Sequence, residues 1–236
     1  MQAATPYERS HLDSYWELQR SPNFEIHSVG LDEGLHPAIS AELGEYYLEW
    51  RDVDLTGGLI SHQLRFRHFW FAWATTGALP EVHGEIDVLP LLDAVEQGDG
   101  QPIIVERESH RRFHSQLRCI AGSRGTGNGH LTHLRLPPDG GSVEIWFDDQ
   151  LVDIDPEIRD HPSTFVKLDL TYGEYMDALL ATKGARGWEL LFANIDLTHR
   201  SLQTTVANLR NMLEVFPALF PDHDYTPFRE RLTARL

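Results

Sequence analysis

Residues 131–149 are LTHLRLPPDGGSVEIWFDD, two runs of alternating apolar residues separated by a turn sequence. Alternation with a period of two places one set of side chains on one face of a strand. Proline followed by two glycines favours a tight reversal of the chain, because proline fixes φ and glycine permits positive φ. The stretch therefore predicts an antiparallel hairpin with strands over 132–136 and 143–147.

Two helical patterns precede the hairpin. Residues 7–20 place three apolar side chains on one face, and residues 39–50 carry a longer stripe at i, i+4, i+7, i+8 and i+11. This spacing is typical of an amphipathic helix, and Gly57 and Gly58 follow as a stop signal. Residues 23–37, rich in glycine and polar side chains, are predicted to be a connector.

Two further helices are expected after the hairpin. Thr171 and Glu174 have capping-box spacing ahead of an apolar stripe, and Gly184 is a plausible end of that helix. A last helix is predicted over 201–216, with Pro217 stopping it.

Strand patterns occupy the middle of the chain. Residues 67–74 are aromatic, 102–105 form a brief apolar run, and 113–120 alternate. The order of helix, antiparallel strands and helices predicts an α+β fold, mainly an antiparallel sheet packed against flanking helices. We expect a single domain over 1–236, with a core at about 36–195 and helical extensions at 1–35 and 196–236.

Composition narrows the class of protein. The chain has 236 residues, with 36 Asp and Glu against 20 Lys and Arg, a formal net charge of −16. Nucleic acids and anionic membranes require clustered basic residues, so neither is an expected partner. The single cysteine, Cys119, excludes an intrachain disulfide framework and is predicted to lie in the core. The N-terminal twenty residues have no apolar signal core, and the chain is expected to be cytoplasmic.

Residues 122–129 are a glycine-rich cluster, GSRGTGNG. A phosphate-binding loop needs Lys followed by Ser or Thr after its last glycine and a helix next, and neither is present in the sequence. We predict a flexible loop between two strands.

Histidine pairs are the candidate metal ligands, but their spacing is poor. His110 and His114 lack the glutamate that a metalloprotease helix requires, and His130 and His133 would point to opposite faces of a strand. His223 and the aspartate after it resemble a ligand pair with no further ligands evident. We therefore expect neither a metal site nor another cofactor.

An acidic stretch follows the hairpin. It fails the EF-hand pattern, because the positions that need Gly and Glu hold Ile158 and Thr164. It is either a solvated loop or part of a face for a cationic partner. In the second case the partner-binding residues are Asp148, Asp149, Asp153, Asp155 and Glu157.

Aromatic side chains could anchor such a partner only if they are exposed. Trp70, Trp73 and Trp146 are the candidates, and the more common alternative is that all three lie in the core.

The order of features resembles the SUKH superfamily, which includes the fungal cell-wall synthesis regulator and many bacterial immunity proteins. The similarity covers about residues 39–192 and rests on the helix ending in Gly57-Gly58, the hairpin over 131–149, the acidic loop and the helix over 172–180. The family has no catalytic signature. The resemblance implies a SUKH-like fold and a non-catalytic immunity protein that neutralises a cognate toxin in the cytoplasm.

Three functions follow as hypotheses. The first is an immunity protein whose toxin is basic, with a nuclease as one candidate, because a strongly acidic protein can cover a basic cleft. The second is a regulatory or scaffold protein of the same fold with a cellular partner. The third is a metal-dependent hydrolase that uses His and Asp ligands.

Overall fold

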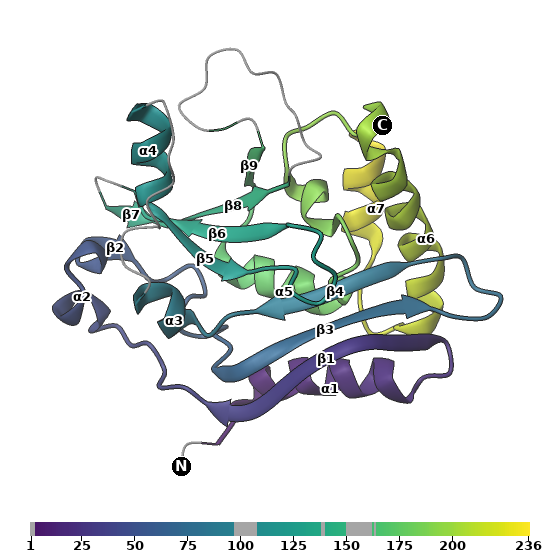
Figure 1. Ribbon diagram of the computed structural model, residues 1–236, viewed down its shortest axis with the longest axis horizontal. Coiled ribbons are helices and arrows are strands. Elements are labelled where there is room, and N and C mark those ends of the chain that lie inside the picture. Colours follow the sequence, from purple (N-terminus) through teal and green to yellow (C-terminus); the bar gives the residue numbers. More distant parts are fainter. Residues whose placement is uncertain (1–2, 97–107, 138–139, 150–161, 163) are drawn as a thin grey trace.

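A seven-stranded antiparallel sheet organises the computed structural model, which describes residues 3–96, 108–137, 140–149, 162 and 164–236. The strand order is β1-β3-β4-β5-β6-β8-β9 (Figure 1). A separate parallel pair joins β2 to β7. The strand bounds are β1 (Phe24–Leu35), β2 (Val53–Asp54), β3 (Phe66–Thr75), β4 (His83–Val88), β5 (Leu117–Ala121), β6 (Leu131–Arg135), β7 (Gly141–Ser142), β8 (Glu144–Asp148) and β9 (Phe165–Leu168).

Helices surround this sheet, so the predicted α+β class is confirmed. Figure 1 shows α1 along β1, α5 behind the central strands, and α6 with α7 at one side. The helix bounds are α1 (Pro6–Arg20), α2 (Leu43–Tyr46), α3 (Leu91–Glu96), α4 (Glu108–Ser115), α5 (Tyr172–Thr182), α6 (Gln203–Leu219) and α7 (Thr226–Thr233). Short 3₁₀ turns are η1 (Leu48–Trp50), η2 (Trp188–Phe192) and η3 (Arg200–Leu202).

The hairpin predicted from residues 131–149 is confirmed. Strands β6 and β8 pair antiparallel, with Leu134 opposite Ile145, and both side chains are buried. Gly140 and Gly141 have φ of 77° and 100°, the left-handed backbone that glycine adopts without a steric penalty. The capping box at the start of α5 is also confirmed, since Thr171 Oγ1 accepts from the N–H of Glu174.

The predicted connector over 23–37 is wrong, because residues 24–35 form the edge strand β1. Its register against β3 shifts twice, between Ile26 and Ser28 and between Asp32 and Leu35. Each shift moves the next side chain to the other face, which destroys the period of two that marks a strand in a sequence. A Cβ at Gly30 would overlap the ring of Trp70 on β3, so that glycine permits a close approach and does not mark a loop.

The continuous helix predicted over 39–50 is also wrong. The chain forms the four-residue α2, an extended residue at Tyr47 (φ −121°, ψ 106°) and the 3₁₀ turn η1. A Cβ at Gly44 would lie 2.6 Å from Cα of Arg51, so the chain after the break folds back against α2. Leu43 and Trp50 stay buried, whereas the break turns Tyr46 outward.

The strand predicted over 113–120 is shorter than expected. Residues 108–115 form α4, and β5 begins only at Leu117. Phe113 is nevertheless buried, because the helix presents it to a small cluster with Leu117, Trp146 and Phe165. The apolar run at 102–105 lies outside the described residues.

Pro217 does not stop the last predicted helix, because α6 continues to Leu219. Proline lacks the N–H that would bond to the carbonyl of Leu213 four residues earlier. Here Nη2 of Arg229 in α7 donates to that carbonyl at 3.0 Å, so the broken helical bond is replaced. The helix α7 that supplies this donor was not predicted.

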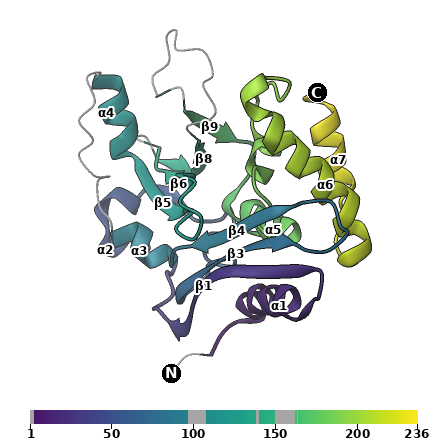
Figure 2. The ribbon, with the colours of Figure 1, turned by 45° about the vertical axis from the view of Figure 1, so that its right-hand side comes forward.

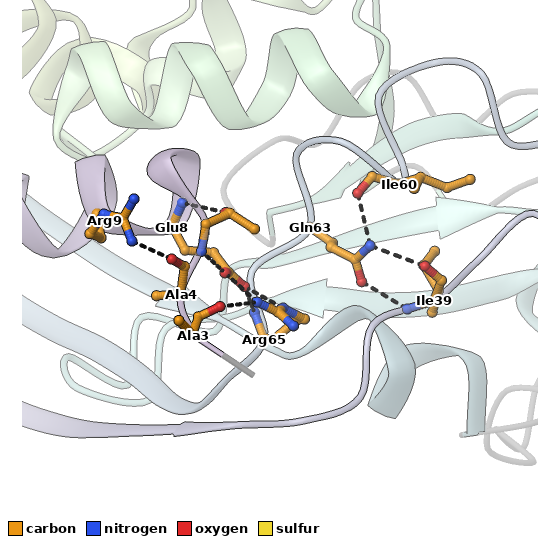
Figure 3. Close-up of polar contacts among 9 residues, drawn as sticks. Ala3, Ala4, Glu8, Arg9, Ile39, Ile60, Gln63 and Arg65 are labelled. Atoms are coloured by element: carbon orange, nitrogen blue, oxygen red, sulfur yellow. Dashed lines mark hydrogen bonds and ion pairs between the residues drawn. The ribbon is translucent and has the colours of Figure 1, made fainter. Parts of the chain in front are cut away.

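Two buried polar contacts fix the segment between α1 and β3 (Figure 3). Oε1 of Gln63 accepts from the N–H of Ile39 at 2.8 Å, and its Nε2 donates to the carbonyls of Ile39 and Ile60. Arg65 donates from Nε and Nη2 to the two carboxylate oxygens of Glu8, each at 2.7 Å. These bonds hold α1 and the chain that leads to α2 against the edge of the sheet.

One cluster of buried side chains joins elements from both ends of the chain. Leu18 of α1, Trp73 of β3, Trp188 of η2 and Phe216 of α6 belong to it, each at most 1% exposed. The terminal helices therefore share a core with the sheet.

His11 of α1 is fully buried, and neither ring nitrogen has a hydrogen-bond partner among the described residues. Its neighbours include the rings of Tyr7 and Phe69. Burial, with Lys183 and His62 adding to it and Glu8 opposing, lowers the pKa of His11 to about 3. The protein therefore holds this histidine neutral.

This burial predicts a pH-dependent stability. Because the unfolded chain protonates His11 near its ordinary pKa and the folded chain does not, stability falls as pH drops below that value. We expect the His11 contribution to cost about 2 kcal/mol between roughly pH 7.5 and pH 5. Urea denaturation at both pH values measures the free energy of unfolding. His11→Leu should lose less of it between pH 7.5 and pH 5 than wild type, by that amount, whereas His27→Leu, at an exposed site, should lose as much as wild type. If His11→Leu loses as much unfolding free energy as wild type, His11 is not the buried neutral histidine described here.

Candidate functional site

The sheet splits between β4 and β5. Among the described residues, these strands share the single pair Val88 and Ala121. The other half of β4 bonds instead to the turn after α5, where the N–H of Glu85 donates to the carbonyl of Gly184 at 2.9 Å and the N–H of Arg186 donates to that of His83. Side chains of β4 and of the segments that follow β5 line the space between the two strands.

The glycine-rich loop connects β5 to β6 and covers this split. As predicted, it joins two strands, but it is tied to β4 by two carboxylates and is not free. Glu85 accepts from the N–H of Gly125 at 2.6 Å and from the hydroxyl of Thr126. Asp87 accepts from the backbone N–H and from Nε and Nη2 of Arg124 at 2.5–3.0 Å. The spacing of Glu85 and Asp87, two residues apart on one strand, places both on one face of the sheet.

A cavity of about 310 Å³ lies between the loop, β1, β4 and the turn after α5. This volume is at the lower end of the range of small-molecule sites. Its polar wall side chains come from segments far apart in sequence and include Ser28, Glu85, His130, Arg186 and Glu189.

Burial shifts the titration of these groups. Desolvation, with the charge of Asp149 adding to it, raises the pKa of Glu189 to about 8, so the carboxyl is mostly protonated at neutral pH. Desolvation lowers the pKa of His130, and Arg186 lowers it further, although Asp149 opposes both. Desolvation also raises the pKa of Glu85 against the hydrogen bonds from the loop. Shifted groups around one cavity are typical of functional sites.

The acidic residues predicted to bind a partner lie partly in this region. Asp148 ends β8 and is half-buried, and burial raises its pKa. Asp149 is 2% exposed, and its Oδ1 lies 3.6 Å from Nε2 of His130, so it offers a partner no exposed carboxylate. Asp153, Asp155 and Glu157 lie outside the described residues.

The tryptophans proposed as anchors are largely interior. Trp73 and Trp146 are buried, and Trp70 is half-buried under the glycine-rich loop. Cys119 of β5 is half-buried rather than fully in the core, and desolvation raises the pKa of its thiol to about 11. These residues do not form an exposed binding face.

The predicted histidine pairs do not form a ligand set. His110 and His114 share the helix α4, and the rings of His114 and His133 both pack against Phe165. Asp224 accepts from the N–H of Thr226 at the start of α7. Within the described part of the chain, no three side chains of His, Cys, Asp or Glu form a group that could hold a metal ion.

An exposed acidic surface, missed by the sequence analysis, lies on α2 and η1. Tyr46 is 74% exposed and Leu48 is 70% exposed, which is unusual for residues of this size. Glu42, Glu45 and Glu49 are exposed around them. We call these five residues the α2–η1 surface. On a regular helix Glu42, Glu45, Tyr46 and Glu49 would share one face, at i, i+3, i+4 and i+7, but the predicted apolar stripe placed Tyr46 on the buried side. Its exposure is what the sequence did not indicate.

Buried neighbours hold the α2–η1 surface in place. Leu43 and Trp50, at 4% and 1% exposure, anchor it from beneath. Nη2 of the buried Arg118 lies 3.8 Å from Glu49, and the hydroxyl of Tyr47 donates to Glu96 of α3. Figure 2 shows α2 on the opposite side of the molecule from α6 and α7, as does Figure 1.

Comparison of the chain with protein-family models, with curated proteins and with solved structures finds no match. The resemblance to the SUKH superfamily therefore stays a prediction. Of the helices in the described residues, none is both long enough and apolar enough to span a membrane.

Proposed function

We propose that the chain is a non-catalytic binding protein that covers a basic protein partner with its α2–η1 surface. The observation that carries the proposal is the exposure of Tyr46 and Leu48 on a short segment that also exposes three glutamates. Exposed aromatic and aliphatic side chains at the centre of an interface supply affinity, and surrounding charges select a partner of opposite sign.

The charge of the whole chain supports the same partner. A net charge of −16 attracts a basic protein over several ångströms and accelerates association at low salt. Within the surface itself, Glu49 lies 3.8 Å from Nη2 of Arg118, whereas Glu42 and Glu45 are exposed and form no ion pair with the described residues. The surface therefore presents carboxylates outward.

The specific partner that the SUKH resemblance implies is a toxin, which makes the chain an immunity protein acting in the cytoplasm. A basic nuclease cleft is one surface that such carboxylates could occupy in place of phosphates. The acidic residues Asp153, Asp155 and Glu157 stay a prediction as additional contacts.

The test is protection of cells against the toxin encoded beside this chain's gene. We expect co-expression to restore growth and the two purified proteins to form a stoichiometric complex on size exclusion. The variant Glu42→Lys/Glu45→Lys/Tyr46→Ala should weaken the complex by at least about 30-fold, the effect of losing one strong anchor.

A matched control reverses the same number of charges elsewhere. Glu214 and Glu230 are exposed on α6 and α7, on the opposite side of the molecule (Figure 2). Glu214→Lys/Glu230→Lys should bind within a few-fold of wild type. If both variants lose affinity equally, net charge alone acts and the surface assignment is wrong. If the wild type neither protects cells nor forms a complex, the toxin proposal is wrong.

A further inference from the structure

Arg186 is held in the wall of the cavity by its backbone. Its N–H donates to the carbonyl of His83 at 2.9 Å, and its own carbonyl accepts from Nδ2 of Asn208 at 3.0 Å. Both bonds are independent of the side chain. They place a guanidinium beside the split in the sheet.

The buried Nε–H of the Arg186 guanidinium has no acceptor among the described residues. Leaving a buried N–H of a charged group without an acceptor is costly. An arginine fork is well suited to a carboxylate or a phosphate, because both present paired oxygens at matching spacing.

A second unused hydrogen-bonding group lines the same cavity from the opposite segment. Ser28 lies at the irregularity in β1, and its Oγ is buried without a partner among the described residues. A serine hydroxyl can donate to an anionic oxygen. Ser28 and Arg186 thus approach the cavity from β1 and from the turn after α5.

The acidic side chains of the cavity do not compete for Arg186. Glu85 accepts from the backbone and side chain of the glycine-rich loop. Oδ1 of Asp149 lies 3.6 Å from Nε2 of His130, so this carboxylate faces the imidazole and not Arg186, and that ring nitrogen has no hydrogen-bond partner among the described residues. The carboxyl of Glu189, with its raised pKa, is mostly uncharged at neutral pH and can donate a hydrogen bond.

We propose that the cavity binds the oxyanion group of a small molecule, with Arg186 pairing with the anion and Ser28 donating to it. The volume of about 310 Å³ admits a small metabolite-sized ligand and excludes a folded partner. This site is independent of the α2–η1 surface, since the two share no residue.

The experiment is thermal unfolding of the full chain in increasing inorganic phosphate or acetate, each against sodium chloride of equal ionic strength. We expect a saturable rise of the unfolding midpoint, about 3–6 °C at ten times the dissociation constant, in one of the two series. A response to phosphate assigns the ligand to phosphorylated compounds, and a response to acetate assigns it to carboxylates.

The variants decide whether the cavity is responsible. Arg186→Gln should abolish the shift, and Ser28→Ala should raise the dissociation constant about tenfold, the effect of one hydrogen bond to a charged group. Arg200→Gln, at an exposed arginine before α6, should leave it unchanged. No saturable shift in either series, or the same shift in Arg186→Gln or in Ser28→Ala as in wild type, would overturn the proposal. Should Arg186→Gln not fold, Ser28→Ala alone decides.

Discussion

We expect Arg65→Ala to lower the free energy of unfolding by about 3–5 kcal/mol, because it leaves the carboxylate of Glu8 buried without its counter-ion. Glu8 is 0% exposed and Arg65 is 5% exposed, so water cannot replace the lost partner without structural change. The backbone N–H groups of residue 65 and of Thr5 also donate to Glu8, at 3.1 and 2.7 Å, and two hydrogen bonds do not neutralise a charge. Urea denaturation followed by circular dichroism measures the loss.

A double variant distinguishes a buried charge from lost packing. Glu8→Leu/Arg65→Met removes both charges and keeps apolar volume, so we expect it to cost less than Arg65→Ala alone. Part of its cost comes from the capping box at Thr5, which Glu8 completes. If the double variant is less stable than Arg65→Ala, the buried-charge explanation is wrong.

We expect Gly184→Ala to cost about 2–4 kcal/mol, the sum of left-handed backbone strain and overpacking. Gly184 has φ of 66°, and a Cβ there would overlap the carbonyl oxygen of Glu85. That overlap falls on the backbone of β4, which cannot rotate away as a side chain can. The same change should disturb the cavity, because the carbonyl of Gly184 accepts from the N–H of Glu85.

Gly77 provides the matched control. Its φ is 73°, close to that of Gly184, but a Cβ there would have no atom within 4 Å. Gly77→Ala should therefore cost only about 1 kcal/mol, the strain of the backbone alone. Equal losses of unfolding free energy in the two variants would contradict the close approach between β4 and the turn.

Local signals were enough to predict several elements. The capping box of Thr171 and Glu174 and the alternation around Leu134 and Ile145 depend on neighbours in sequence, and both are confirmed. Irregular elements were not accessible in this way. The register shifts of β1 and the break at Tyr47 arise where tertiary packing overrides a local period.

The cavity could not be predicted for a related reason. Its walls depend on β4 leaving β5 and bonding to Gly184, a contact between residues 85 and 184 that are far apart in the sequence. Nothing near Arg186 in the sequence indicates that it lines the same cavity as Ser28. The glycine-rich loop was correctly placed between strands, but the two carboxylates that tie it down come from a different strand.

The exposed acidic residues with an exposed aromatic neighbour lie on the α2–η1 surface and not at Asp148 and Asp149. From the sequence, the acidic stretch that begins at Asp148 is either a solvated loop or part of a face for a cationic partner, and within it Asp149 is buried against His130. Exposed glutamates close to Tyr46 in sequence combine charge with an exposed aromatic side chain, which is the reason that we propose this surface for a basic partner.

Hydrogen–deuterium exchange of the complex with the proposed basic protein partner tests the central claim most directly. Our account predicts slower exchange on binding at amides of residues 42–50, with those of α6 and α7 unchanged. Slower exchange confined to other segments, with residues 42–50 exchanging as in the free protein, would contradict it.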